Sequence, residues 1–183
     1  VNLKADHLNY TVIQYLYMRS LFPDKEMNDR TLTVNKYYLN QVKRFWINKN
    51  LFSKAMIAIS LFKNNDQKAA KDIIKSLQEN AIINPELGTY WKENIGGYFW
   101  FQAPIESQSI AIEAFSLVTP GNTFIDDLKT WLLKNKQTNN WRTTKATAEA
   151  CYALLMRGTT WVPSKNEVTI KLGNKTIKSD EEK

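Results

Sequence analysis

Residues 51–63, LFSKAMIAISLFK, decide the predicted fold. In a helix, this segment would present apolar side chains on nearly every side, and such a helix is buried among other helices. Two later segments have the same character: residues 105–118 (IESQSIAIEAFSLV) and residues 143–157 (TTKATAEACYALLMR). The sequence therefore predicts three inner helices, which begin similarly with Ser53-Lys54-Ala55, Ser107-Gln108-Ser109 and Thr144-Lys145-Ala146.

Amphipathic segments alternate with these inner helices at residues 32–48, 67–80 and 123–136. A helix with one apolar stripe lies on the outside of a fold. A further helix is expected at residues 6–21, with Asp6 as its N-cap. Consecutive helical hairpins with an inner and an outer layer indicate an all-α fold, either an α/α toroid or a helical solenoid, and the alanine-rich inner helices favour the toroid. We expect the chain not to close a ring alone, and to self-associate through the apolar surface left exposed.

Two segments depart from the helical pattern. Residues 82–104 are rich in Gly and aromatic residues, and a short hairpin turning at Gly96-Gly97 is one interpretation. Residues 166–172 alternate polar and apolar side chains, and Gly173-Asn174 follows as a turn, so a strand and a hairpin are expected there. The predicted domains are an α/α toroid over residues 1–158 and the start of a β domain over residues 159–183.

Composition excludes several classes of protein. The chain has 183 residues, 12% of them aromatic, which is too many for a disordered chain. Its single Cys and single His exclude a disulfide framework and make a zinc site improbable. The mean hydropathy of −0.44 and the absence of a long uncharged apolar run argue against a transmembrane helix. The chain begins at Val1 without a signal peptide, and we expect it to be part of a longer protein.

The net charge of +7 is concentrated in residues 31–75. Aromatic residues lie among these bases, a combination that also occurs on nucleic-acid-binding surfaces. No nucleic-acid-binding motif accompanies it, and solvated faces of amphipathic helices explain the bases more simply. We therefore expect no nucleic-acid partner; the aromatics concerned are Tyr37, Tyr38, Phe45, Trp46 and Phe52.

Three glutamates interrupt the inner helices: Glu106, Glu113 and Glu149. Glycosidases built on α/α toroids use two carboxylates across a central cleft, so Glu113 and Glu149 are an acid–base hypothesis for a carbohydrate-active enzyme. The simpler interpretation is structural, with Lys145, four residues before Glu149, as an ion-pair partner. The sequence favours the structural interpretation.

The remaining residues that could carry chemistry, Asp126-Asp127, His7 and Cys151, are not accompanied in the sequence by the further residues that a catalytic or metal site would need. Asp126-Asp127 resembles a magnesium-binding aspartate pair, but it also suits the first turn of an outer helix. His7 is expected near a helix start, as a surface or capping residue. Cys151 is expected to be buried and slow to react, since it lies in the most apolar helix. The predicted sites are therefore none for catalysis, none for a cofactor and none for a metal.

The stretch WLLKNKQTNNWRTTKATAEACYALLMRG (131–158) resembles the end of the thioester domain of bacterial alpha-2-macroglobulins. The resemblance rests on Trp131-Leu132, Trp141 and the run from Thr143 to Thr147. Upstream, YFWFQAPIESQSIAIEAF (98–115) and LFSKAMIAISLFKNND (51–66) resemble the preceding inner helices. The strand EVTIKLG (167–173) fits the β-sandwich segment that follows in the family.

The resemblance implies an α/α toroid inside a bacterial endopeptidase inhibitor of the periplasm or cell envelope, with a lipid anchor on the parent chain as one form of attachment. In this family the parent traps proteases, and an internal thioester in a C-x-E-Q motif acylates the attacker. The motif does not occur here, since Tyr152-Ala153-Leu154 follows Cys151. The family order places the thioester before Val1, and some members lack it. We therefore expect a non-catalytic interaction fragment, with other domains of the parent and trapped proteases as partners.

Overall fold

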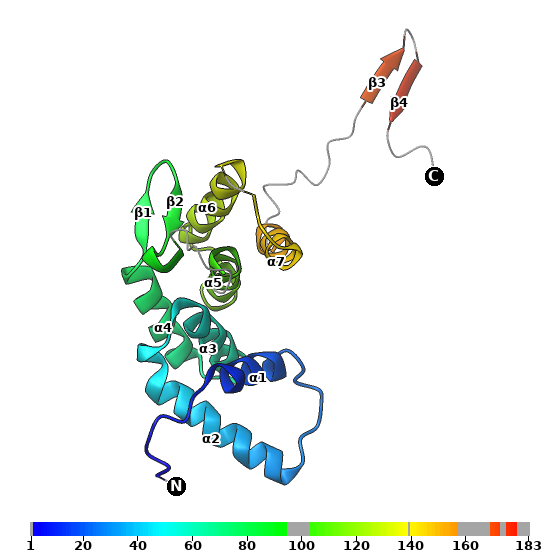
Figure 1. Ribbon diagram of the computed structural model, residues 1–183. Coiled ribbons are helices and arrows are strands. Elements are labelled where there is room, and N and C mark those ends of the chain that lie inside the picture. Colours follow the sequence, from blue (N-terminus) through cyan, green and yellow to red (C-terminus); the bar gives the residue numbers. More distant parts are fainter. Residues whose placement is uncertain (1, 95–102, 139, 157–168, 173–174, 179–183) are drawn as a thin grey trace.

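The computed structural model describes residues 2–94, 103–138, 140–156, 169–172 and 175–178. This part of the chain is mostly helical, as predicted, with seven α-helices, two 3-10 turns and two small hairpins (Figure 1). The α-helices are α1 (Tyr10–Ser20), α2 (Asp29–Phe45), α3 (Leu51–Lys63), α4 (Gln67–Glu79), α5 (Pro104–Val118), α6 (Phe124–Thr138) and α7 (Thr144–Leu155). No helix within these described ranges has the length and apolar character needed to cross a membrane.

Side chains just before the helices fix where most of them begin. Each capping side chain accepts a hydrogen bond from a backbone N–H of the first turn, which satisfies a donor that has no partner inside the helix. Five helices begin in this way, after Asn9, Asn28, Asn50, Asp66 and Thr143. The expected cap for the first helix was wrong, because Asn9 caps α1. Asp6 instead accepts a hydrogen bond from the Leu8 N–H and pairs with Lys49 at 2.8 Å.

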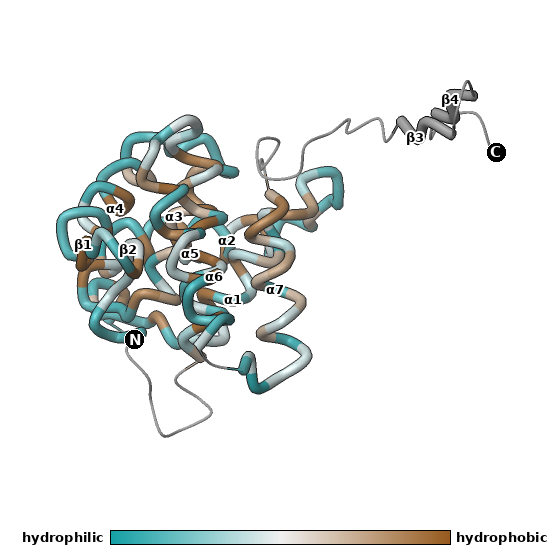
Figure 2. The backbone as a smooth tube through the Cα atoms, turned by 90° about the horizontal axis from the view of Figure 1, so that it is seen from above, coloured by the Kyte–Doolittle hydropathy of each residue, from teal (hydrophilic) through white to brown (hydrophobic). Residues whose placement is uncertain are grey.

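The odd-numbered helices form a row, in which α1 packs on α3, α3 on α5 and α5 on α7 (Figure 1). The even-numbered helices pack against this row: α2 contacts α1 and α3, α4 contacts α3 and α5, and α6 contacts α5 and α7. This arrangement confirms that the amphipathic segments lie outside the row. In Figure 2, seen from above, hydrophilic segments gather at the rim of the helical body and hydrophobic ones inside it.

The prediction of three helices buried on all sides holds for two of them. In α3 and α5, most side chains are buried. In α7, only Ala146, Ala150 and Ala153 are buried, while Tyr152 and Leu155 remain 59% and 66% exposed. The difference in burial follows from position. Helix α7 is the last helix of the row, and within the described chain it packs mainly on α5 and less on α6.

A small antiparallel hairpin, β1 (Ile82–Asn84) and β2 (Gly88–Tyr90), follows α4 and packs on α6. Gly88 makes this close approach possible: its φ is +84°, and a Cβ there would lie 2.4 Å from the Asp127 carbonyl oxygen. The Trp91 indole N–H donates to the Leu77 carbonyl at 2.9 Å and joins the hairpin to α4. The expected turn at Gly96-Gly97 lies outside the described residues.

A second antiparallel hairpin consists of β3 (Thr169–Leu172) and β4 (Lys175–Lys178). Its register pairs Ile170 with Ile177. The strand and the hairpin expected near the C-terminus are therefore present. The proposed domain boundary at residues 158 and 159 lies outside the described residues.

Candidate functional site

Glu113 on α5 lies half-buried beside α1. The phenolic O–H of Tyr17 on α1 donates to Glu113 Oε2 at 3.0 Å, so the two side chains join helices far apart in the chain. Burial raises the pKa of the Glu113 carboxyl above its usual value, and the nearby Glu149 carboxylate raises it further. The Tyr17 hydrogen bond and the Lys63 charge act in the opposite direction.

Glu149 on α7 lies close enough to Glu113 and Glu106 for their charges to interact. Burial raises its pKa above the usual value, and the Glu106 carboxylate adds to this effect. Lys145 lies 3.6 Å from Glu149 in the i,i+4 position, which confirms the ion pair expected from the sequence. The structure thus brings together the two glutamates of the acid–base hypothesis, together with Glu106.

Two tyrosines, Tyr17 and Tyr152, lie near Glu113 and join the group formed by Glu106, Glu113 and Glu149. Burial raises the pKa of the Tyr17 phenol, and its hydrogen bond and charge interaction with Glu113 add to the shift. Burial and the Glu113 charge also raise the pKa of Tyr152 on α7. The sequence analysis missed both tyrosines, because nothing in the sequence indicates that α1 and α7 approach the same glutamate.

The cluster is poorly suited to two-carboxylate catalysis. A glycosidase pair needs one carboxylate kept ionised and one kept protonated, so their environments must shift the two pKa values apart. Here the pKa of Glu113 and that of Glu149 move in the same direction. Neither glutamate lines the pocket between α1 and α2 or the pocket between α2 and the end of α3. The geometry fits a polar contact among α1, α5 and α7 better than a substrate cleft.

The remaining candidate residues have structural surroundings. Asp126 and Asp127 are exposed in the first turn of α6, where negative charge stabilises a helix N-terminus. His7 Nδ1 lies 2.6 Å from the Tyr37 hydroxyl, and the His7 backbone N–H donates to Gln41, so His7 fastens the N-terminal segment to α2. Within the described residues, no three His, Cys, Asp or Glu side chains form a group that could hold a metal ion.

The expected burial of Cys151 was wrong. Its side chain is exposed on the outer face of α7, because no further helix of the described chain covers that face. An exposed thiol is open to reagents, so its reactivity is not limited by burial.

Two of the basic side chains in segment 31–75 have local partners. Lys43 Nζ lies 2.7 Å from Asp66, and the Arg44 guanidinium lies over the Phe45 ring. Five of the six aromatics within this segment are partly buried against the core, which leaves few rings for stacking on bases; they are Tyr38, Phe45, Trp46, Phe52 and Phe62.

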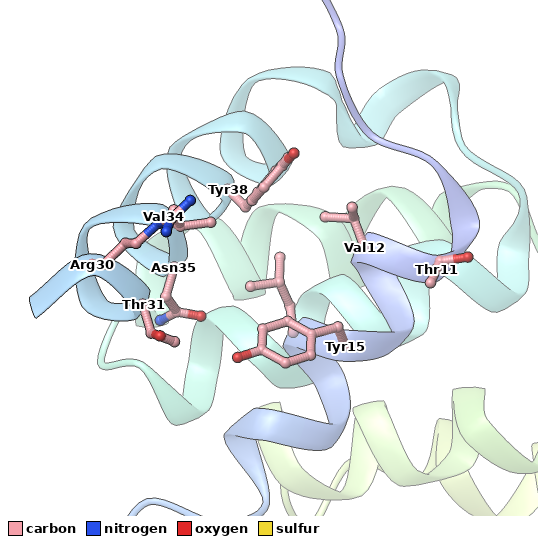
Figure 3. A pocket seen from close by; sticks show the side chains of 9 residues that line it. Thr11, Val12, Tyr15, Arg30, Thr31, Val34, Asn35 and Tyr38 are labelled. Carbon is pink, nitrogen blue, oxygen red and sulfur yellow. The ribbon is translucent and has the colours of Figure 1, made fainter. Parts of the chain in front are cut away.

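A groove lies between α1 and α2, at the α1 end of the row of odd-numbered helices (Figure 3). Its volume is 410 Å³, within the range of ligand pockets. Side chains of α1 form one wall and side chains of α2 the other (Figure 3). The lining is mainly apolar with a few polar groups, and consists of Thr11, Val12, Tyr15, Leu16, Arg30, Thr31, Val34, Asn35 and Tyr38.

Comparisons of the chain with protein-family models, with curated proteins and with solved structures find no match.

Proposed function

We propose that this chain is a non-catalytic structural and interaction module, part of an α/α toroid in a bacterial alpha-2-macroglobulin-like protease inhibitor. The observation that carries the proposal is the row of helical hairpins, whose end helices α1 and α7 both leave apolar packing surface exposed. Large exposed apolar side chains at both ends indicate surfaces built for contact with further protein. They include Tyr15, Met18 and Phe22 near one end, and Tyr152 and Leu155 at the other.

The resemblance of residues 98–158 to the family's thioester domain gives the proposal its particular form. Helices α5, α6 and α7 occupy most of that stretch, and they alternate between the row and its outer layer as the family pattern requires. The hairpin of β3 and β4 supports a β segment after residue 158. On this proposal the toroid is completed by other parts of the parent, which acts in the periplasm or at the cell envelope.

The proposal assigns no chemical step to these residues. Glu113 is bonded to Tyr17, and Glu149 is paired with Lys145. Cys151 stands in no C-x-E-Q motif, so no residue of the chain supplies an acyl group. Protease capture would be a property of the parent, with this module transmitting or supporting its rearrangement.

A trapping assay on the full-length protein tests this proposal. After incubation with a protease, a trap leaves the enzyme active on a small peptide substrate and inactive on a protein substrate, because enclosure excludes only large molecules. We expect this split in activity. Equal activity on both substrates would contradict the inhibitor function.

A second assay, thiol release on adding methylamine, tells whether the parent carries a thioester: one thiol beyond Cys151 indicates a covalent trap, and none indicates physical trapping.

The alternative from another class is a carbohydrate-active toroid enzyme that uses Glu113 and Glu149. Their electrostatic interaction is the observation in its favour. Under this alternative, Glu113→Gln or Glu149→Gln abolishes hydrolysis of a glycan that the wild type cleaves. We expect no hydrolysis by the wild type across a panel of glycans, and an unchanged trapping assay in both variants of the full-length protein.

A further inference from the structure

Glu106 and Glu113 lie on the side of α5 that faces away from α6. Residues seven positions apart share one face of a helix, whereas residues two positions apart lie on nearly opposite faces. On α5, Gln108 donates to an α6 carbonyl and Phe115 packs on Phe124 of α6. Each glutamate comes two positions before one of these residues, so both carboxylates belong to the other side of the helix.

Helices α1 and α7 contribute side chains to this same side of α5. Tyr17 of α1 donates its phenolic O–H to Glu113 Oε2 at 3.0 Å. On α7, Glu149 and Tyr152 are three positions apart on one face, and both interact with Glu113 through charge. Tyr17 also interacts with these two residues of α7, and Glu106 interacts with Glu149. The five side chains thus form one group across three helices, which we name the glutamate face.

Basic residues neutralise the glutamate face only in part. Lys145 lies 3.6 Å from Glu149, but its side chain is 64% exposed, so water screens this ion pair. Lys63 of α3 acts on Glu113 through its charge. Burial outweighs these bases, and the pKa values of Glu113 and Glu149 both lie above their usual value. Ionisation of the glutamate face therefore costs free energy in the folded chain.

Helix α7 is the element that such a cost affects first. Its buried side chains are three alanines, each of which contributes little apolar area. The ammonium group of Lys129 adds two hydrogen bonds near its C-terminal end. Helix α5, by contrast, is enclosed by α3, α4, α6 and α7. Repulsion between α5 and α7 should therefore cause local opening of α7 before it affects the rest of the chain.

We propose that the glutamate face is a pH-sensitive contact, which holds α7 on α5 when it is protonated and favours separation of α7 when it is ionised. Separation returns Glu149 to water and removes it from Glu113, so the two carboxyls lose their protons at lower pH than in the packed form. Above the ordinary value of 4.5, the packed form thus binds more protons than the open form. The contribution of the contact is fully present below pH 4.5 and is lost as pH rises through the pKa values of the packed form.

This property goes beyond the proposed function. It concerns the control of one helix contact within the module, and it requires no partner outside the chain. The trapping assay measures enclosure of a protease by the full-length protein, whereas the experiment below measures the opening of α7. Failure of either test therefore leaves the other intact.

Hydrogen exchange across a range of pH tests the proposal. Protection factors, corrected for the pH dependence of intrinsic exchange, report the free energy of local opening. We expect protection in α7, relative to α5, to fall about threefold or more between pH 4.5 and neutral pH. The double variant Glu113→Gln/Glu149→Gln should lose this fall, whereas the control Glu86→Gln, at an exposed site in the β1–β2 turn, should retain it. Wild-type protection that does not fall, or a double variant that retains the fall, would overturn the proposal.

Tyr17→Phe provides a second measurement that keeps all glutamates in place. The Tyr17 hydrogen bond lowers the pKa of Glu113, so its loss should move the midpoint of the change in protection to higher pH. His7→Gln is the matched control, because it removes the only histidine of the chain, a residue type that also changes charge near neutral pH. His7 lies against Tyr37 of α2, so this variant should leave the midpoint unchanged. An unmoved midpoint in Tyr17→Phe, or a moved one in His7→Gln, would contradict the role of the glutamate face.

Discussion

Helices α5 and α7 have similar sequences and different surroundings. Both are apolar or small on most sides, with a glutamate in the middle. In α5, side chains are buried along nearly the whole helix, because α3 and α7 flank it and α4 and α6 also pack on it. In α7, three alanines are buried and the opposite face is exposed. An apolar helix face therefore predicts a need for neighbours, whereas burial depends on whether the chain itself supplies them.

The buried core of α5 should make the largest difference in stability. Phe115 is 0% exposed and packs on Trp91 and Phe124. We expect Phe115→Ala to lower the free energy of unfolding by about 3–5 kcal/mol, because it removes a buried ring and leaves a cavity. The matched change Leu155→Ala on the exposed face of α7 should cost no more than about 0.5 kcal/mol. Urea denaturation measures both, and equal losses would remove the distinction between the two helices.

The polar centre of α5 should give the next largest effect. Gln108 is 0% exposed; its amide donates to the Thr89 and Leu128 carbonyls and accepts from Asn94. Gln108→Leu leaves these buried groups without partners, and we expect a loss of about 2 kcal/mol or more in the free energy of unfolding. The control Gln78→Leu, at an exposed site on α4, should change it little. A neutral Gln108→Leu would mean that the network contributes no net stability.

Lys129 should contribute to the local stability of α7. Its ammonium group, on α6, donates to the Leu154 and Met156 carbonyls at 3.2 and 2.8 Å and so caps the C-terminal end of α7. We expect Lys129→Met to cost about 1 kcal/mol, with the loss concentrated in α7. Tryptic cleavage after Lys145, inside α7, should become faster than in the wild type. Faster cleavage throughout the chain, with no preference for Lys145, would contradict a local role.

The smallest expected effect concerns pH and the contact of α5 with α1. Because the pKa of Glu113 is raised in the folded state, the folded chain binds more protons than the unfolded chain above the ordinary value of 4.5. The contribution of Glu113 is thus fully present below pH 4.5 and is lost as pH rises through the folded pKa. Glu113→Gln should gain stability relative to the wild type between pH 4.5 and neutral pH, since its amide oxygen still accepts from Tyr17. Urea midpoints at both ends of this range measure the change, and a constant difference would argue against it.

The helices were predictable from the sequence because they depend on local signals. The hydrophobic pattern located the seven α-helices of the described chain; the segment expected at residues 67–80, for example, is helix Gln67–Glu79. The first two helix starts were misplaced, because several Asn and Asp side chains near them compete for the N-cap position. The exposure of α7 and Cys151 was not predictable, since a sequence pattern does not tell which neighbours a helix has.

The contacts that define the candidate site were also hidden from the sequence. Tyr17 and Glu113 lie 96 positions apart, and Lys129 reaches carbonyls more than 20 positions away. Only the local Lys145–Glu149 pair followed from spacing alone. The groove between α1 and α2 depends on how two helices diverge, which their sequences do not indicate.

Hydrogen exchange of the chain at low concentration tests most directly the claim that α5 is the enclosed helix and α7 the open one. We predict that amides of α5 exchange only through global unfolding, while amides of α7 exchange through local opening at a clearly lower free energy. Equal protection of the two helices, with both following global stability, would contradict this account of the fold.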